Sequence, residues 1–122
     1  MTDKIDVEKI KKMLAEFAEA RDWEKFHSPK NLCMAIAGES GELLEIFQWM
    51  TEKESIQVKN QPELAEQVSH ELADIILYII RMADLLDIDL NASIQTKMAI
   101  NNKKYPVERV KGSAKKYDQY KQ

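Results

Sequence analysis

Two segments of this sequence carry acidic residues at a spacing that could hold a metal ion. Glu39, Glu42 and Glu45 are spaced by three in the run LCMAIAGESGELLEIFQW, and Glu71 and Asp74 follow at the same spacing in a later segment. Residues three apart are neighbours on one face of a helix. Successive members rise by about 4.5 Å and turn by about 60°. Glu39 with Glu42, or Glu42 with Glu45, therefore share a site more easily than all three.

These acidic residues have few basic neighbours. No Lys or Arg occurs between Lys30 and Lys53, and Asp74 is the one residue of the run LADIILYII that is not apolar. A buried carboxylate is costly unless it is paired, protonated or bound to a metal. We therefore expect Asp74 to be buried and the counter-charge to come from outside the chain. Oxygen ligands with little His or Cys favour Mg²⁺ or Mn²⁺ over Zn²⁺ or Cu²⁺.

Carboxylates at this spacing also occur without such a metal site. Glutamates on helices are mostly solvated surface residues. A ferritin-like di-iron bundle needs two Glu-x-x-His motifs, and only Glu24 to His27 fits, which disfavours that class. Gly38 and Gly41 lie beside the first acidic set, where each costs a helix about 1 kcal/mol relative to Ala. They leave room either for a ligand or for a closely packed helix.

Composition indicates one soluble globular domain, and the helix patterns described below predict that it is all-α. The chain has 122 residues, 44% hydrophobic and 32% charged, with three Gly and three Pro, which suits a globular domain and disfavours a turn-rich β-sandwich. The charged N-terminal segment does not fit a signal peptide, and no run approaches the roughly 20 apolar residues of a membrane span. The single Cys33 excludes an internal disulfide and is expected to be a small buried side chain. We expect a cytoplasmic protein.

Charge is unevenly distributed along the chain. Residues 1–96 hold 10 basic and 19 acidic side chains, whereas residues 97–122 hold 8 basic and 2 acidic ones. The C-terminal excess is either a solvated basic tail or a cationic patch for polyphosphate, and charge alone does not decide. The acidic body disfavours nucleic-acid binding.

Apolar periodicity and capping residues predict four helices. Ser28-Pro29 and Pro62 suit helix starts, and Tyr105-Pro106 suits a helix end. The expected helices span residues 6–21, 28–50, 62–86 and 92–104, with connectors between them and a loosely structured segment after residue 106. The third helix is apolar on nearly all faces, which four helices cannot easily enclose. We therefore expect a homo-oligomer.

The order of the motifs resembles the MazG-like nucleoside triphosphate pyrophosphatase superfamily, closest to its dCTP pyrophosphatase branch. The resemblance covers roughly residues 15–106. It is carried by Glu39-x-x-Glu42, by Glu71-x-x-Asp74, by Phe26-His27-Ser28-Pro29 and by Lys97-Met98-x-x-Asn101-x-x-Lys104-Tyr105-Pro106. It implies a four-helix protomer, here a domain over residues 1–106 followed by a basic tail over 107–122, assembling into homodimers or homotetramers.

The resemblance also implies an activity and a metal site. The expected reaction cuts a nucleoside triphosphate between its α- and β-phosphates, with dCTP or modified deoxynucleotides as substrates and cleansing of the nucleotide pool as the role. Mg²⁺, with Mn²⁺ as the alternative, would be held by four ligands: Glu39, Glu42, Glu71 and Asp74. Glu45 would be a further ligand, a supporting group or a base. A catalytically inactive nucleotide-binding regulator or helical scaffold is the alternative function.

Two further residue sets follow from the resemblance. The expected phosphate-binding residues, three of which share a helix face, are Lys97, Asn101, Lys104, Tyr105 and, more weakly, Lys30. The expected base-binding residues are Trp23, His27, Trp49, Phe17 and Tyr78. The alternatives are a solvated face for the first set and ordinary core packing for the second, above all for Phe17 and Tyr78.

Overall fold

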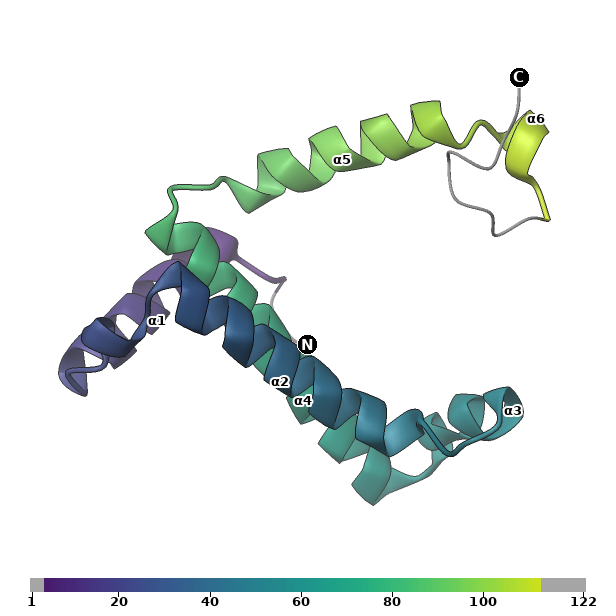
Figure 1. Cartoon of the computed structure of the whole chain (residues 1–122), viewed down its shortest axis with the longest axis horizontal. Helices are drawn as coiled ribbons and strands as arrows, with labels where there is room; N and C mark the ends of the chain where they lie inside the picture. The colour runs from purple at the N-terminus through teal and green to yellow at the C-terminus, as the bar shows by residue number, and fades with distance from the viewer. Residues whose placement is uncertain (1–3, 113–122) are drawn as a thin grey trace. The chain divides into compact units, whose positions relative to one another are not determined.

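The computed structural model describes residues 4–112, and helices are the only regular structure among them. The four long helices are α1 (Val7–Ala20), α2 (Pro29–Phe47), α4 (Pro62–Leu85) and α5 (Leu90–Lys104) (Figure 1). The short ones are the 3-10 turns η1 (Glu24–Phe26) and η2 (Gln57–Asn60) and the helices α3 (Glu52–Ile56) and α6 (Val107–Val110). The predicted all-α class is confirmed.

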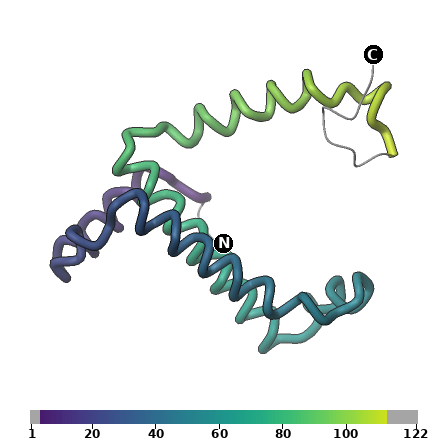
Figure 2. The backbone as a smooth tube through the Cα atoms, viewed as in Figure 1, coloured from purple at the N-terminus to yellow at the C-terminus, as the bar shows by residue number. Residues whose placement is uncertain are grey.

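The chain divides into two compact units after Ile88. In the first unit α2 and α4 run antiparallel side by side, and α1 packs against α4 (Figure 2). The second unit contains α5 and α6. The predicted domain boundary at residue 106 stays a prediction, and residues 113–122 of the predicted basic tail lie outside the described residues.

The helix starts follow the predicted caps. The Ser28 side chain accepts a hydrogen bond from the Asn31 backbone N–H at 3.1 Å, with Pro29 at the first helical position. The connector predicted at residues 51–61 is wrong, because Thr51 and Glu54 form a reciprocal capping box that starts α3. Residues 107–110 form one helical turn rather than a loose segment.

Two aspartates in the left-handed backbone region end α1 and α4. Asp22 and Asp87 both have φ of 55°. After the first, the Trp23 N–H donates to the Ala18 carbonyl at 2.9 Å, and after the second, the Ile88 N–H donates to Ala83 at 2.8 Å. These bonds close the helix ends in the manner usually provided by glycine. The first of them turns the chain so that Trp23 meets α1.

The buried core of the described residues is small. Its members are Val7, Ala18, Leu32, Val58, Ile80, Arg81 and Ala83. Leu72, Ile76 and Ile79 of α4 remain 48%, 40% and 38% exposed, so this chain alone does not cover the apolar run. Cys33 is exposed, and its predicted burial is wrong because α2 buries only Leu32. None of the described helices is long and apolar enough to cross a bilayer.

Replacing Asp87 by Gly should stabilise the chain by about 0.5–1 kcal/mol, because glycine adopts a positive φ without the steric cost of a Cβ. Chemical denaturation followed by circular dichroism measures the change. The matched control is Glu16→Gly, at an exposed position inside α1, which should destabilise by about 1 kcal/mol. Destabilisation by both substitutions would show that the Asp87 side chain stabilises the turn.

Candidate active site

Three carboxylates from two helices meet in the first unit. Glu39 and Glu42 come from α2 and Glu71 from α4, and one oxygen of each lies within 4.8 Å of the others. The antiparallel packing of α2 and α4 turns two acidic motifs that are distant in sequence into one group. We call these three residues the acidic group.

The acidic group contains polar atoms with no partner. The Oε2 atoms of Glu39 and Glu71 are buried and make no hydrogen bond. A side-chain hydrogen bond with Glu71, then partial burial, then the negative charges nearby raise the pKa of Glu39 from its ordinary 4.5 to about 7. The nearby carboxylates thus disfavour the fully ionised state, and a bound cation would relieve the same repulsion. Oxygen-only ligands with unsatisfied buried lone pairs fit a hard divalent cation.

Asp74 and Glu45 lie beside the acidic group. The predicted burial of Asp74 is wrong, because α1 and α2 leave its side of α4 open and its side chain is exposed next to a cavity. Its charge nevertheless contributes to the raised pKa of Glu39. Glu45 is exposed and lines an open hollow with Glu42 and Glu71. Of the two pairings that spacing allows on α2, the structure groups Glu39 with Glu42.

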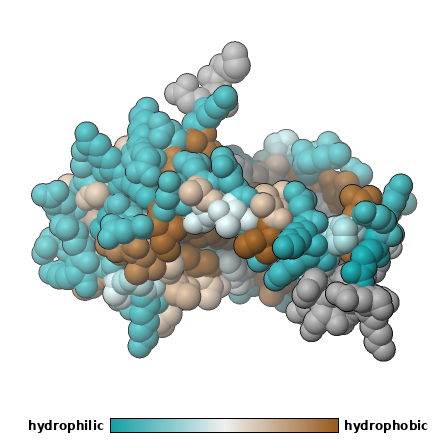
Figure 3. All heavy atoms as spheres, turned by 90° about the horizontal axis from the view of Figure 1, so that it is seen from above, coloured by the Kyte–Doolittle hydropathy of each residue, from teal (hydrophilic) through white to brown (hydrophobic). Residues whose placement is uncertain are grey.

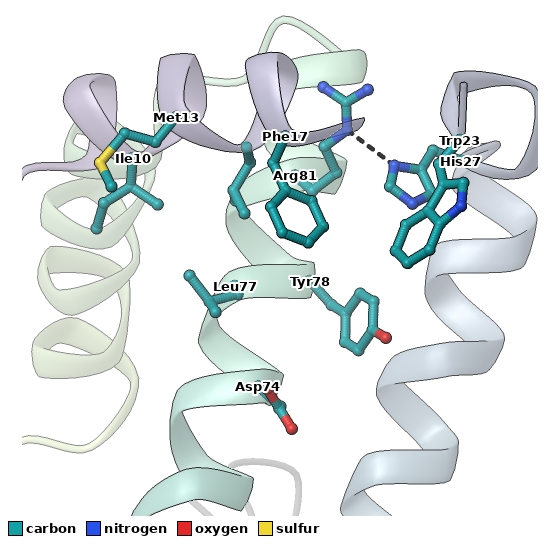
Figure 4. Close-up of a pocket in the computed structure, with 10 residues that line it drawn as sticks. Ile10, Met13, Phe17, Trp23, His27, Asp74, Leu77, Tyr78 and Arg81 are labelled. Carbon is teal, nitrogen blue, oxygen red and sulfur yellow. Dashed lines mark hydrogen bonds between the residues drawn. The ribbon is translucent and has the colours of Figure 1, made fainter. Parts of the chain in front are cut away.

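An apolar cavity of about 470 Å³ lies between α1, the connector that follows it and α4 (Figure 4). Its lining residues are Ile10, Met13, Leu14 and Phe17 of α1, Trp23 and His27 of the connector, and Asp74, Leu77, Tyr78 and Arg81 of α4. Four of the five predicted base-binding residues are therefore in one place. Phe17 and Trp23 meet edge to face with ring centroids 5.7 Å apart, and the Arg21 guanidinium lies 3.6 Å over the Phe17 ring.

Tyr78 and Asp74 connect the cavity with the acidic group. Both line the cavity. The pKa of the Tyr78 hydroxyl is raised first by burial and then by the charges of Glu39, Asp74 and Glu42. The charges of the acidic group therefore act on the end of the cavity that Asp74 and Tyr78 line. An apolar flat group bound in the cavity could thus extend an anionic group toward the carboxylates.

Arg81 is a cavity residue that no motif of the sequence identifies. It is 6% exposed, and its Nε donates a hydrogen bond to Nδ1 of His27 at 3.2 Å (Figure 4). Its Nη1 lies 3.5 Å from Oδ2 of Asp84. Burial and the Arg81 charge lower the pKa of His27. The sequence feature that could have identified Arg81 is its position, seven residues after Asp74 and therefore on the same helix face.

The remaining predicted residues lie elsewhere. Trp49 follows the far end of α2, is 89% exposed and does not line the cavity. Lys30 is exposed in the first turn of α2. Lys97, Asn101 and Lys104 lie on α5, and Tyr105 caps it, all in the second unit. Their phosphate-binding role stays a prediction. Among the described residues, no helix packs closely against Gly38 or Gly41, since a Cβ at either position would meet nothing within 4 Å. Room for a ligand, or for a helix of another chain, is what remains of the two alternatives.

Comparison with known proteins gives one consistent picture. The sequence model of the MazG-like family matches residues 34–119. The chain is 41% identical over 111 residues to dCTP pyrophosphatase 1 of Rattus norvegicus and 40% identical to that of Homo sapiens, covering 91% of this chain. It spans about 65% of the length of these two relatives. A crystal structure of a pyrophosphatase from Archaeoglobus fulgidus superposes with a TM-score of 0.76 at 34% identity, covering 87% of this chain and 97% of that one.

The raised pKa of Glu39 predicts how stability depends on pH and metal. Between its ordinary pKa of 4.5 and its raised pKa of about 7, Glu39 holds a proton in the folded chain that it loses on unfolding, so the metal-free chain should lose thermal stability as pH rises from about 5 to 7 and change little above that. Added MgCl₂ should raise the melting temperature more at pH 8 than at pH 6, because the cation competes with the proton.

Thermal melts in EDTA and in MgCl₂ between about pH 5 and 8 measure this effect. Glu39→Gln should flatten the pH dependence in EDTA, whereas Glu16→Gln, an exposed position on α1, should leave it as in the unmodified chain. An equal slope in Glu39→Gln would place the titrating group elsewhere.

Proposed function

Because this chain belongs to the MazG-like family, we propose that it is a nucleoside triphosphate pyrophosphohydrolase. It would convert a nucleoside triphosphate and water to the monophosphate and diphosphate. The observation that carries the proposal is the acidic group, whose charges act on one end of an aromatic-lined cavity. That arrangement offers one place for a base and an adjoining place for a charged phosphate chain.

The acidic group would hold Mg²⁺, with Mn²⁺ as the alternative. Glu39, Glu42 and Glu71 supply oxygen ligands from two helices, and Asp74, whose charge acts on Glu39, is proposed as the fourth ligand. When bound, the ion would neutralise phosphate charge, orient the reacting groups and lower the pKa of a bound water. The unpartnered Oε2 atoms of Glu39 and Glu71 support this assignment.

The chain's own residues would perform the remaining steps. Phe17 and Trp23 provide flat apolar faces for the base, and stacking on aromatics contributes about 1–3 kcal/mol per base in nucleotide-binding proteins. The same apolar wall excludes water from the base end of the ligand. A glutamate of the acidic group, or Glu45, would accept the proton of the attacking water. Attack at the α-phosphorus then releases diphosphate.

The substrate is proposed to be dCTP or a modified deoxycytidine triphosphate. The two mammalian relatives are named for dCTP, and the cavity of about 470 Å³ suits a single base and sugar. Lys97, Asn101, Lys104 and Tyr105 are proposed to hold the phosphates, with Lys30 as a weaker candidate. Nucleotide-pool cleansing and a cytoplasmic location are proposed with this activity.

We further propose that the chain works as a homodimer or homotetramer. Apolar side chains lie at its surface among hydrophilic ones (Figure 3), including Leu44 at 61% and Leu72 at 48% exposure. A second copy packed on α2 and α4 would bury them and would occupy the open space at Gly38 and Gly41. Trp49, at 89% exposure, would then contact a neighbouring copy.

The decisive assay measures product release from dCTP with Mg²⁺ and with EDTA. We expect diphosphate and dCMP with Mg²⁺ only. Glu71→Gln should lower turnover by about 100-fold or more, because it removes a charge that would hold the metal. The matched control is Glu63→Gln, an exposed position in the first turn of the same helix, which should keep full turnover.

Three results would contradict parts of this proposal. Release of single phosphate would move the cut to another bond. Nucleotide binding without turnover on a panel of NTPs and dNTPs would favour a regulator or scaffold. Full turnover in Glu71→Gln would remove the acidic group from the mechanism.

A further inference from the structure

The contact between Arg81 and His27 fixes which nitrogen of the imidazole is free. A guanidinium has only donors and stays charged. Since Nε of Arg81 lies 3.2 Å from Nδ1 of His27, this ring nitrogen must accept a hydrogen bond. A neutral imidazole that accepts at Nδ1 carries its proton on Nε2. The other nitrogen of His27, a residue that lines the cavity, is therefore a donor.

We propose that Arg81 is a positioning residue that keeps His27 neutral with its proton on Nε2, so that the cavity presents a fixed donor to an acceptor on the base. The identity of the ligand as a base rests on the proposed function, whereas the state of His27 does not. The Nε2–H donor of His27 would then determine which ligands the cavity accepts.

The surroundings of the pair favour this state. A second proton on His27 would bring two cations within 3.2 Å, and burial and the Arg81 charge already lower its pKa. Arg81 is held by Asp84 at 3.5 Å. The other titratable groups facing the cavity are Asp74 and Tyr78, and Arg21 of α1 lies over Phe17. Among these groups, Arg81 is the one hydrogen-bonded to the imidazole.

A fixed donor distinguishes bases by their chemistry. O2 is an acceptor in cytosine, uracil and thymine alike, but N3 is an acceptor in cytosine and carries a hydrogen in uracil and thymine, so a donor that faces N3 distinguishes them. A donor buried against another N–H is left unpaired, which costs more than a missing contact. The cavity should therefore take a base that turns an acceptor to His27 and reject one that turns an N–H.

The first test uses the unmodified chain. Long-range ¹H–¹⁵N NMR of the histidine rings between pH 5.5 and 8 shows which nitrogen is protonated, and a His70→Gln variant assigns the signals. We expect the proton on Nε2 and a second protonation only below the ordinary pKa of 6.5. A proton on Nδ1, or titration at the ordinary value, would overturn the proposal.

The second test compares two arginine variants. Arg81→Met should raise the pKa of His27 and admit the other tautomer, whereas Arg21→Met should leave both unchanged. Unchanged His27 signals in a folded Arg81→Met protein would reduce Arg81 to a structural residue and refute the proposal. If the Met variant does not fold, the NMR test on the unmodified chain still decides the protonation state of His27.

The third test is a double-mutant cycle with dCMP as the probe. Arg81→Met should weaken dCMP binding about fivefold to tenfold, the value of one hydrogen bond. In a His27→Phe background, which keeps the ring but loses the donor, it should have no effect. Equal losses in both backgrounds would refute the positioning role. Failure of the unmodified chain to bind dCMP would count against the proposed function, while the NMR result would still judge Arg81.

Discussion

The constraint on which this structure depends is the repulsion among carboxylates brought into a small volume. Glu39, Glu42 and Glu71 lie within 4.8 Å of one another, and two of their oxygens are buried without a partner. Ordinary folding would separate such groups, because each adds to the cost of ionising the others. Their position is enforced by the packing of α2 on α4. A ligand that removes the repulsion must therefore stabilise the fold, by a free energy that grows with the logarithm of its affinity.

The same helix pair explains why few side chains are buried among the described residues. Two long helices in one layer can bury only the sides that face each other, and α2 buries Leu32 alone. The exposed apolar side chains of α4 then follow from geometry rather than from a poor sequence. This packing leaves one side of the helix pair open, where Asp74 and Tyr78 are accessible to the proposed ligand. Coverage of the remaining apolar surface is left to other chains in our proposal.

Local signals in the sequence predicted the long helices, because Ser28, Pro29 and Pro62 act on the nearest turn of backbone. They missed α3, whose start depends on one reciprocal pair, Thr51 with Glu54. The spacing of the glutamates allowed Glu39 to pair with Glu42, since residues three apart share a helix face, whereas their meeting with Glu71 of another helix was implied only by the family resemblance. The pairing of Arg81 with His27 joins residues 54 apart, and no local pattern encodes such a contact. Burial of Asp74 and Cys33 was mispredicted because exposure depends on neighbouring helices that periodicity does not place.

The single continuous helix α4 carries residues of both the acidic group and the cavity. Glu71 and Arg81 are ten residues apart on it, which corresponds to about 15 Å of helix. A helix does not shorten to suit a smaller ligand, so in our proposal α4 sets the distance between the site of the base and the site of the phosphates. A molecule that binds at one end but is too short reaches no carboxylate at the other. The site would then select its ligand by length as well as by base. Insertion of a single residue in α4 would lengthen the helix and rotate Glu71 relative to Arg81.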